Sequence, residues 1–328
     1  MKKDKLEKFI FVVKKTNELE IEEIKQINNL FNKSFTESLA KNRSEEEFRK
    51  KFKNNIYNYS FHGMVKENSK VIGSYNVIPQ EFEYLKKKKI FGLSVDTCFE
   101  KNYRGNLYNL RTIANMVYLE LINDSIPFVY GQPNNKFYLV KKKVLGWKDI
   151  GKLNYYLTPV NFKKILFNSK ILNLLIIKII KLFLNIGIKS TNAFFPNISK
   201  VSNEIFFKGR YNDIHKKIEF NNILGFFKII NLKKYINFKI VYLIDVIPLS
   251  KENLTIISNE LAKKFLDIEL IVYLGYFNST PKDFLKFPKF LLKNQNLFSG
   301  KILDNSVLDN EIFNLENWNV NSSNFDTV

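Results

Sequence analysis

The sequence predicts an α/β protein made of two mixed-sheet halves in tandem, of which the second is a degenerate copy of the first. A length of 328 residues allows about two domains, and strand-like apolar runs alternate with apolar residues at helical spacing. The stretch from Asp96 through a helix to Gly131 has a counterpart from Asp245 to Gly275, which indicates an internal repeat. The expected ranges are 1–160 for the first half, 161–203 for a connector with a basic apolar helix, and 204–328 for the second half.

Apolar spacing and turn residues predict the individual elements. Ser44 and Glu47 form a capping-box pattern at the start of a second helix, and Asn106 is the expected N-cap of a later one. In chain order the first half is expected to contain a strand at 9–13, helices at 18–35 and 44–54, strands at 60–66, 71–84 with a break at Pro79, and 90–100, a helix at 107–124, a strand at 127–132, a helix at 134–145 and a strand at 149–157. The second half is expected to contain strands at 226–232 and 239–247, a helix at 251–265 and a strand at 269–277.

The composition indicates a folded and strongly basic protein. Hydrophobic residues make up 45% and charged residues 26% of the chain, which excludes a disordered or low-complexity class. Lysine and arginine number 52 against 32 acidic residues, and the net charge of +20 favours anionic partners such as nucleic acid, phosphorylated small molecules or an acidic membrane surface. A coding bias toward lysine would produce the same excess, so both interpretations stay open.

The few cysteines and histidines restrict the available chemistry. The single cysteine, Cys98, permits no internal disulfide, and the opening MKKDKLEKF contains no apolar signal core, so the cytoplasm is the expected location. The two histidines, His62 and His215, cannot build an ordinary zinc site with one cysteine, and no metal is expected.

The most apolar segment, 169–190, carries Lys178 and Lys181 near its middle. Central lysines cost about 2.5 to 3.5 kcal/mol each on membrane-insertion scales, so a spanning helix is not expected. Two alternatives remain, a buried connector and an amphipathic helix lying on an anionic membrane, and the sequence favours the connector.

A turn suited to binding an anion follows the strand that ends near Glu100. The chain passes through Arg104 and Gly105 directly into a helix, whose first backbone N–H groups and positive dipole end suit a pyrophosphate. Arg104 adds positive charge, and Gly105 allows close backbone approach. An ordinary structural turn with an exposed arginine is the alternative.

These residues and their order resemble the GNAT acyltransferase superfamily, particularly its tandem-repeat members among the surface-polysaccharide and amino-group acetyltransferases. The resemblance covers most of the chain. It rests on FGLSVDTCFE at 91–100, KNYRGN at 101–106, YGQPN at 130–134, LGW at 145–147 and the closing ENWNVNSSNFDTV. Anchored on Arg104, the family's loop pattern places Leu107 and Asn109 where small residues are usual, which is a departure from that pattern.

The resemblance implies acetyl-CoA or another acyl-CoA as co-substrate, with its pyrophosphate on the Arg104/Gly105 turn and its pantetheine arm along the preceding strand. The residues implied in cofactor binding are Phe99, Glu100, Arg104, Gly105, Asn106, Leu107 and Asn134.

The resemblance also implies direct acyl transfer from a thioester to an amine, whose ammonium form must first lose a proton. The candidate carboxylates are Asp96, Glu81 and Glu83, and in some relatives the C-terminal carboxylate, here that of Val328, acts as the base. The family's usual tyrosine acid falls on Lys142, so Tyr138, one helical turn earlier, is the substitute candidate.

The expected function is therefore an N-acyltransferase, most simply an N-acetyltransferase, acting on a primary amine of a small molecule such as an amino sugar of a surface polysaccharide. Two alternatives remain. One is an aminoacyl-tRNA-dependent peptidyl transferase of tandem fold, although the retained Arg-Gly turn makes nucleic acid an unexpected partner. The other is a non-catalytic adaptor that binds anionic membrane or glycan, with 169–190 as its peripheral membrane contact.

Overall fold

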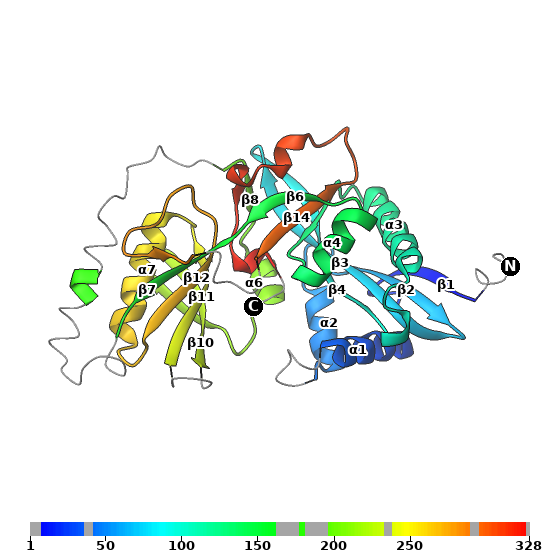
Figure 1. Cartoon of the computed structure of the whole chain (residues 1–328), viewed down its shortest axis with the longest axis horizontal. Helices are drawn as coiled ribbons and strands as arrows, with labels where there is room; N and C mark the ends of the chain where they lie inside the picture. The colour runs from blue at the N-terminus through cyan, green and yellow to red at the C-terminus, as the bar shows by residue number, and fades with distance from the viewer. Residues whose placement is uncertain are drawn as a thin grey trace. The chain divides into compact units, whose positions relative to one another are not determined.

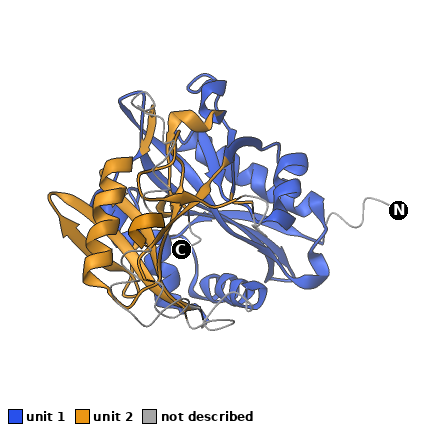
Figure 2. Cartoon of the chain, turned by 60° about the vertical axis from the view of Figure 1, so that its left-hand side comes forward, with its two compact units in different colours: residues 1–151, 200–210, 297–313 blue, residues 152–199, 211–296, 314–328 orange. Residues whose placement is uncertain are grey.

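The computed structural model describes residues 8–35, 42–161, 177–180, 196–232, 238–288 and 295–325 (Figure 1). The chain divides into two compact units built from discontinuous segments (Figure 2). Unit 1 comprises residues 1–151, 200–210 and 297–313, and unit 2 comprises 152–199, 211–296 and 314–328. The contiguous ranges expected from the sequence stay a prediction about which segments fold on their own.

Unit 1 contains a mixed sheet with the strand order β1-β2-β3-β4-β5-β14-β6. The pairs β1–β2, β2–β3 and β3–β4 are antiparallel, β4–β5 is parallel, and β14 runs antiparallel to β5. The strands are β1 (Ile10–Lys15), β2 (Phe61–Glu67), β3 (Lys70–Tyr84), β4 (Lys87–Phe99), β5 (Phe128–Gly131), β14 (Leu297–Ile302) and β6 (Lys148–Lys152).

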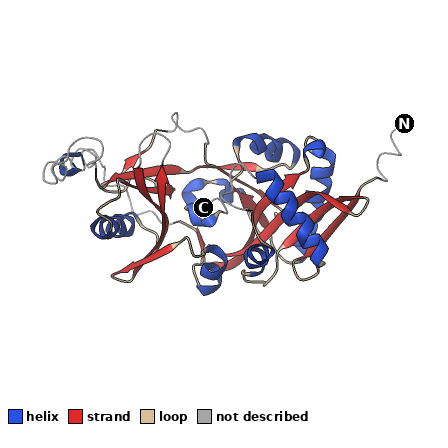
Figure 3. Ribbon diagram, turned by 90° about the horizontal axis from the view of Figure 1, so that it is seen from below, coloured by secondary structure: helices blue, strands red, loops and turns tan. Residues whose placement is uncertain are grey.

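Helices cover both faces of this sheet (Figure 3). They are α1 (Ile21–Phe35), α2 (Glu45–Lys53), α3 (Leu107–Asn123), α4 (Asn135–Val144) and α6 (Glu204–Arg210), with short 3₁₀ turns η1 (Lys101–Tyr103) and η3 (Asn310–Phe313). On β2, a Cβ added at Gly63 would touch Ile113 of α3, whereas the adjacent residue, His62, stacks on Phe48 of α2. Successive strand residues point to opposite faces, so α3 and α2 pack on opposite sides.

The local signals for helix ends are confirmed. Ser44 Oγ accepts a hydrogen bond from the Glu47 N–H at 3.1 Å, and the Glu47 carboxylate accepts one from the Ser44 N–H at 2.7 Å, which completes the capping box. Asn106 caps α3 by accepting a hydrogen bond from the Asn109 N–H at 3.2 Å.

Two strand predictions are wrong. Pro79 does not break β3, because it lies beyond Val77, the last residue that pairs with β2, so its missing N–H is tolerated there. The single strand expected at 149–157 is two strands, β6 in the sheet of unit 1 and β7 (Asn154–Pro159) in the sheet of unit 2.

Unit 2 repeats the central motif of unit 1. Its sheet order is β13-β7-β12-β11-β10-β9, with β10 and β11 antiparallel and β11 and β12 parallel, joined by α7 (Lys251–Lys264). This matches β3-β4-α3-β5 and confirms the predicted pair of mixed sheets. Its strands are β9 (Lys216–Phe220), β10 (Ile223–Leu232), β11 (Phe238–Ile247), β12 (Leu270–Gly275) and β13 (Leu285–Lys286); β8 (Ile198–Lys200) pairs with β15 (Trp318–Asn319), and η4 (Leu315–Asn317) and η5 (Ser322–Asn324) are 3₁₀ turns.

The basic apolar segment at 169–190 lies outside the described residues except for 177–180, which are helical and expose Lys178. Both alternatives for that segment stay predictions. None of the helices in the described parts is long and apolar enough to cross a membrane.

Candidate active site

A β-bulge interrupts β4 in the middle of the unit 1 sheet. Ser74 pairs with Cys98 and Asn76 with Val95, so Asp96 and Thr97 together face the single residue Tyr75. Asp96 has φ of 48°, the left-handed region that aspartate tolerates better than most residues. The bulge turns the strand locally and places the Asp96 side chain off the regular alternation of β4.

Next to the bulge, β4 and β5 separate. Their parallel pairing covers only Gly92 with Val129 and Leu93 with Tyr130. β4 continues along β3 to Phe99, whereas β5 ends at Gly131. From Ser94 onward the backbone of β4 therefore leaves the β5 ladder.

The turn after β4 leads into α3 as the sequence predicts. Gly105 has φ of 100°, and a Cβ built on it would meet no heavy atom within 4 Å, so the turn requires glycine and presents an open backbone. Arg104 folds back along the strand end, with Nε donating to the Phe99 carbonyl at 3.0 Å and Nη2 donating to Ser34 Oγ at 3.3 Å. Leu107 begins the helix half-exposed.

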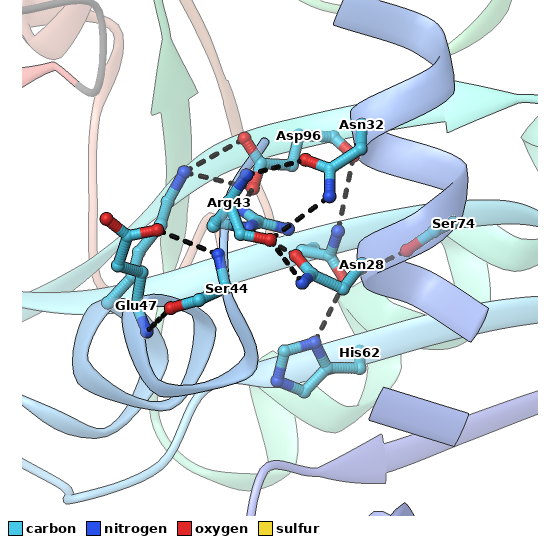
Figure 4. Close-up of polar contacts among 10 residues, drawn as sticks. Asn28, Asn32, Arg43, Ser44, Glu47, His62, Ser74 and Asp96 are labelled. Atoms are coloured by element: carbon cyan, nitrogen blue, oxygen red, sulfur yellow. Dashed lines mark hydrogen bonds and ion pairs between the residues drawn. The ribbon is translucent and has the colours of Figure 1, made fainter. Parts of the chain in front are cut away.

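A buried polar network holds the bulge from the side of α1 and α2 (Figure 4). Asp96 Oδ2 accepts a hydrogen bond from Arg43 Nη1 at 2.5 Å, and both of its carboxylate oxygens lie 2.9 Å from Lys51 Nζ. Arg43 Nε donates to Asn28 Oδ1 at 2.7 Å, and the Arg43 backbone N–H donates to Asn32 Oδ1 at 2.9 Å, which ties the segment before α2 to α1. These contacts rigidify the bulge and neutralise its carboxylate.

Burial acts to raise the pKa of Asp96, but the positive charges of Lys51 and Arg43 outweigh burial and hold that pKa below its usual range. A carboxylate with a lowered pKa is a weak proton acceptor. Asp96 is therefore better suited to fixing the bulge than to taking a proton from an amine.

The same network continues across β2 and β3. His62 Nδ1 lies 2.9 Å from Asn76 Oδ1 and His62 Nε2 lies 2.9 Å from Thr16 Oγ1, while the Asn76 amide donates to the Asp96 carbonyl at 3.2 Å. Burial lowers the pKa of His62 to about 4 and raises that of Cys98 to about 12. His62 is thus a neutral structural residue, and Cys98 is not an activated nucleophile.

Unit 2 contains the same bulge and separation of strands, but there its own chain fills the opening. The register of β10 and β11 shifts between Phe226 and Phe227, and the parallel pairing of β11 with β12 ends at Leu243. The Asn321 amide donates to Asp245 Oδ1 at 2.7 Å, and Ser322 Oγ donates to the Ile244 carbonyl at 3.0 Å.

The residues that fill this opening, 321–324, are all buried. Asp245, the repeat counterpart of Asp96, also accepts a hydrogen bond on Oδ2 from the Tyr211 hydroxyl at 2.8 Å.

Known structures share the overall fold of this chain. A GCN5-related N-acetyltransferase from Anabaena variabilis ATCC 29413 matches with a TM-score of 0.56 and 14% identity, over 89% of this chain and 73% of that one. A probable N-acyltransferase from Enterococcus faecalis V583 matches with a TM-score of 0.58 and 10% identity, over 90% and 73%. A GCN5-related N-acetyltransferase from Kribbella flavida gives 0.56 and 7%, over 90% and 72%.

The chain has a tandem GNAT fold. No protein-family model and no curated protein sequence matches it. The identities lie far below those at which activity transfers, so the likeness is one of fold. In this GNAT fold the bulge and opening of unit 1 occupy the first sheet, and the filled opening occupies the second.

The predicted cofactor-binding residues are placed in two groups. Phe99, Glu100, Arg104, Gly105, Asn106 and Leu107 lie between the end of β4 and the start of α3, with η1 between Glu100 and Arg104. Glu100 there forms an ion pair with Lys70 at 2.7 Å. Asn134 follows β5 and caps α4, with its side-chain oxygen accepting a hydrogen bond from the Phe137 N–H at 2.9 Å.

The predicted catalytic carboxylates are not gathered at the bulge. Glu81 pairs with Lys88 at 3.0 Å, and Glu83 is exposed farther toward the β3–β4 hairpin. Ile78 of β3 pairs with Leu93, where β4 and β5 separate. Glu81 lies three residues farther along β3, which is about 10 Å from Ile78.

Tyr138 lies on the surface of α4, where its hydroxyl is 2.8 Å from both Asp149 carboxylate oxygens and 3.3 Å from Lys142 Nζ. Burial and the Asp149 carboxylate raise the pKa of Tyr138. Val328 lies outside the described residues. Among the described residues, no cluster of three His, Cys, Asp or Glu side chains could hold a metal ion.

Sequence reasoning missed Lys141 and Ser94, which meet at the opening of unit 1. Lys141 Nζ donates to Ser94 Oγ at 3.1 Å. The signal was present, because Lys141 lies four residues after Phe137 and four before Leu145, on the apolar face of the helix. The neighbouring Lys142 and Lys143 make the segment uniformly basic, which hid the apolar position of Lys141.

Proposed function

We propose that unit 1 is an acyl-CoA-dependent N-acyltransferase that moves an acyl group from the CoA thioester to a primary amine of a small molecule. The observation that carries the proposal is the separation of β4 from β5 after Leu93, directly beside the β4 bulge and upstream of the open Gly105 turn. Together these features would supply a strand edge for the pantetheine arm, a gap between β4 and β5 for the thioester, and a turn for the pyrophosphate.

In this proposal, the pyrophosphate of CoA binds the turn at Arg104 and Gly105, where the N-terminal end of α3 contributes partial positive charge. The residues fit the group, because nothing lies within 4 Å of a Cβ at Gly105 and the backbone can be approached closely. The pantetheine amides would bond the backbone of β4 beyond Ser94, as a short added strand does. The Asn134 amide nitrogen is a further donor for the pantetheine carbonyls.

For the chemical step, N–H groups of β4 would polarise the thioester carbonyl, since oriented backbone donors stabilise the negative charge that develops there. The acceptor ammonium must lose a proton, and Glu81, the nearer of the two remaining carboxylates, is the proposed proton acceptor through water. Tyr138 is the proposed donor to the departing thiolate, which requires its hydroxyl to leave Asp149. Asp96 acts as a positioning residue.

The acceptor class follows only from the fold analogy, so amino sugars of surface polysaccharides are the first compounds to test. Isothermal titration with acetyl-CoA tests the cofactor half of the proposal. A panel of amino sugars, with release of free CoA thiol as the readout, tests the transfer. Acetyl-CoA binding without thiol release from any amine would favour the adaptor alternative, and no binding of acetyl-CoA would contradict the proposal.

A further inference from the structure

Lys141 is a buried lysine at the point where β4 and β5 part. Only 3% of the residue is exposed. Its Nζ donates to Ser94 Oγ and lies 3.7 Å from the centroid of the Trp147 ring. A Cβ added at Gly131, the last residue of β5, would lie 3.6 Å from Nζ and 3.1 Å from the Ser94 carbonyl, so the end of β5 lies close to the amine.

The hydroxyl of Ser94 and the ring of Trp147 are neutral partners of the amine. Among the described residues, no carboxylate forms an ion pair with Lys141, and burial alone lowers its pKa to about 7. The Trp147 ring that faces Nζ donates through Nε1 to the Tyr118 hydroxyl, which in turn bonds the Tyr75 hydroxyl, and burial raises the pKa of both tyrosines. These groups are neutral near neutral pH and supply no negative charge to the amine.

A buried cation without a counter-ion is costly, and strongly perturbed lysines in protein interiors are concentrated at functional sites. Leucine or methionine would fill the same position on α4 with better packing. The arrangement is that of a binding site for a negative charge that arrives with a ligand.

We propose that Lys141 selects an acyl-CoA whose acyl group carries a terminal carboxylate, a dicarboxylic acid monothioester such as succinyl-CoA, by pairing that carboxylate with Nζ beside Ser94. The inference rests on the proposed function, because it requires the acyl end of the cofactor to enter the opening between β4 and β5. The carboxylate supplies the missing counter-charge in a site of low dielectric. A neutral acyl group of similar length would leave the amine unpaired.

Competition titrations with acetyl-CoA, butyryl-CoA and succinyl-CoA test this selection. We expect succinyl-CoA to bind about tenfold to a hundredfold more tightly than butyryl-CoA, the range of a charge-assisted hydrogen bond. Equal affinities would overturn the inference while leaving the proposed function intact. Failure of all three to bind would overturn both.

Proton uptake gives a second readout that packing alone would not produce. A bound carboxylate raises the pKa of Lys141, so at pH 8 succinyl-CoA should take up close to one proton more than acetyl-CoA, measured by titration in two buffers of different ionisation enthalpy. No difference between the two ligands would contradict the pairing.

The variant Lys141→Met should remove both the preference and the extra proton and keep acetyl-CoA binding. Lys143→Met, at an exposed position two residues along the same helix, is the matched control and should retain both. Retention of the preference in a folded Lys141→Met protein would also overturn the inference. Because the proton measurement uses the unmodified chain, it decides the question even where that variant fails to fold.

Discussion

Arg43 Nη1 donates to Asp96 Oδ2 at 2.5 Å, and this ion pair joins the segment before α2 to the bulge of β4. The two side chains are only 9% and 5% exposed. Arg43 also lies 3.8 Å from the centroid of the Phe31 ring, so the cation is enclosed by the aromatic layer between the helices and the sheet. The shape of β4, the strand that would hold the thioester in the proposed function, therefore depends on an ion pair. Its cation comes from the segment before α2.

Replacing Asp96 by asparagine should destabilise the protein strongly. The change removes the negative charge that Arg43 and Lys51 both bind, and breaking a buried pair from one side typically costs about 3 to 5 kcal/mol of unfolding free energy. Urea unfolding of Asp96→Asn measures that loss. Glu83→Gln, an exposed carboxylate of β3, is the control and should change the stability by less than about 0.5 kcal/mol. Equal stability of the two variants would show that the pair contributes little.

Replacing Gly105 by valine should abolish acyl-CoA binding. At φ of 100° a β-branched residue is strained, and its side chain would stand over the backbone that the pyrophosphate needs to approach. Titration with acetyl-CoA measures the effect. Asn222→Val places the same residue at another exposed position of positive φ, in the β9–β10 turn of unit 2, and should bind acetyl-CoA normally. A folded Gly105→Val protein with unchanged affinity would show that the assigned site is wrong.

One acyl-CoA should bind per chain. In unit 2 the opening between β11 and β12 is filled by buried residues, with Asn321 and Ser322 bonded to Asp245 and Ile244. That unit also lacks an Arg-Gly turn between its strand and α7. The stoichiometry from isothermal titration is the test, and a value of two would contradict the assignment of unit 2 as a half without a cofactor.

Stability should fall as the pH decreases from about 6.5 toward 4, in part because of His62. Burial lowers its pKa in the folded protein to about 4, against 6.5 for an ordinary histidine, so the unfolded chain binds the proton first. The contribution of neutral His62 to the free energy of unfolding is present above about pH 6.5. It is lost as the pH falls toward the pKa of about 4 in the folded protein. Between pH 7 and pH 5 the loss is about 2 kcal/mol.

The measurement is the difference between the unmodified chain and His62→Gln, each unfolded with urea at both pH values. The glutamine variant should be less stable at pH 7, because it disturbs the bonds to Asn76 and Thr16, yet lose about 2 kcal/mol less on acidification. Identical pH dependence in the two proteins would mean that His62 is not held neutral by burial.

Local signals in the sequence predicted most of the helices of the described residues and the glycine turn after β4, but not α6. Capping at Ser44 and Asn106 depends on hydrogen bonds three residues apart, and the turn at Gly105 depends on one backbone angle, so both are encoded within a few residues. The internal repeat was also recoverable, because β4-α3-β5 and β11-α7-β12 carry the same short order of elements.

The charge pairing and burial that determine the chemistry of the site could not be predicted from local sequence patterns. Asp96 reads as a candidate base in its strand, and only the tertiary structure brings Arg43, 53 residues earlier, and Lys51, 45 residues earlier, against its carboxylate. The separation of β4 from β5, the arrival of β14 beside β5 and the burial of Lys141 are likewise products of packing. The sequence determined which elements form, since their signals are short-range hydrogen bonds and spacing; the tertiary structure decided which charges are paired, because pairing and burial depend on residues far apart in the chain.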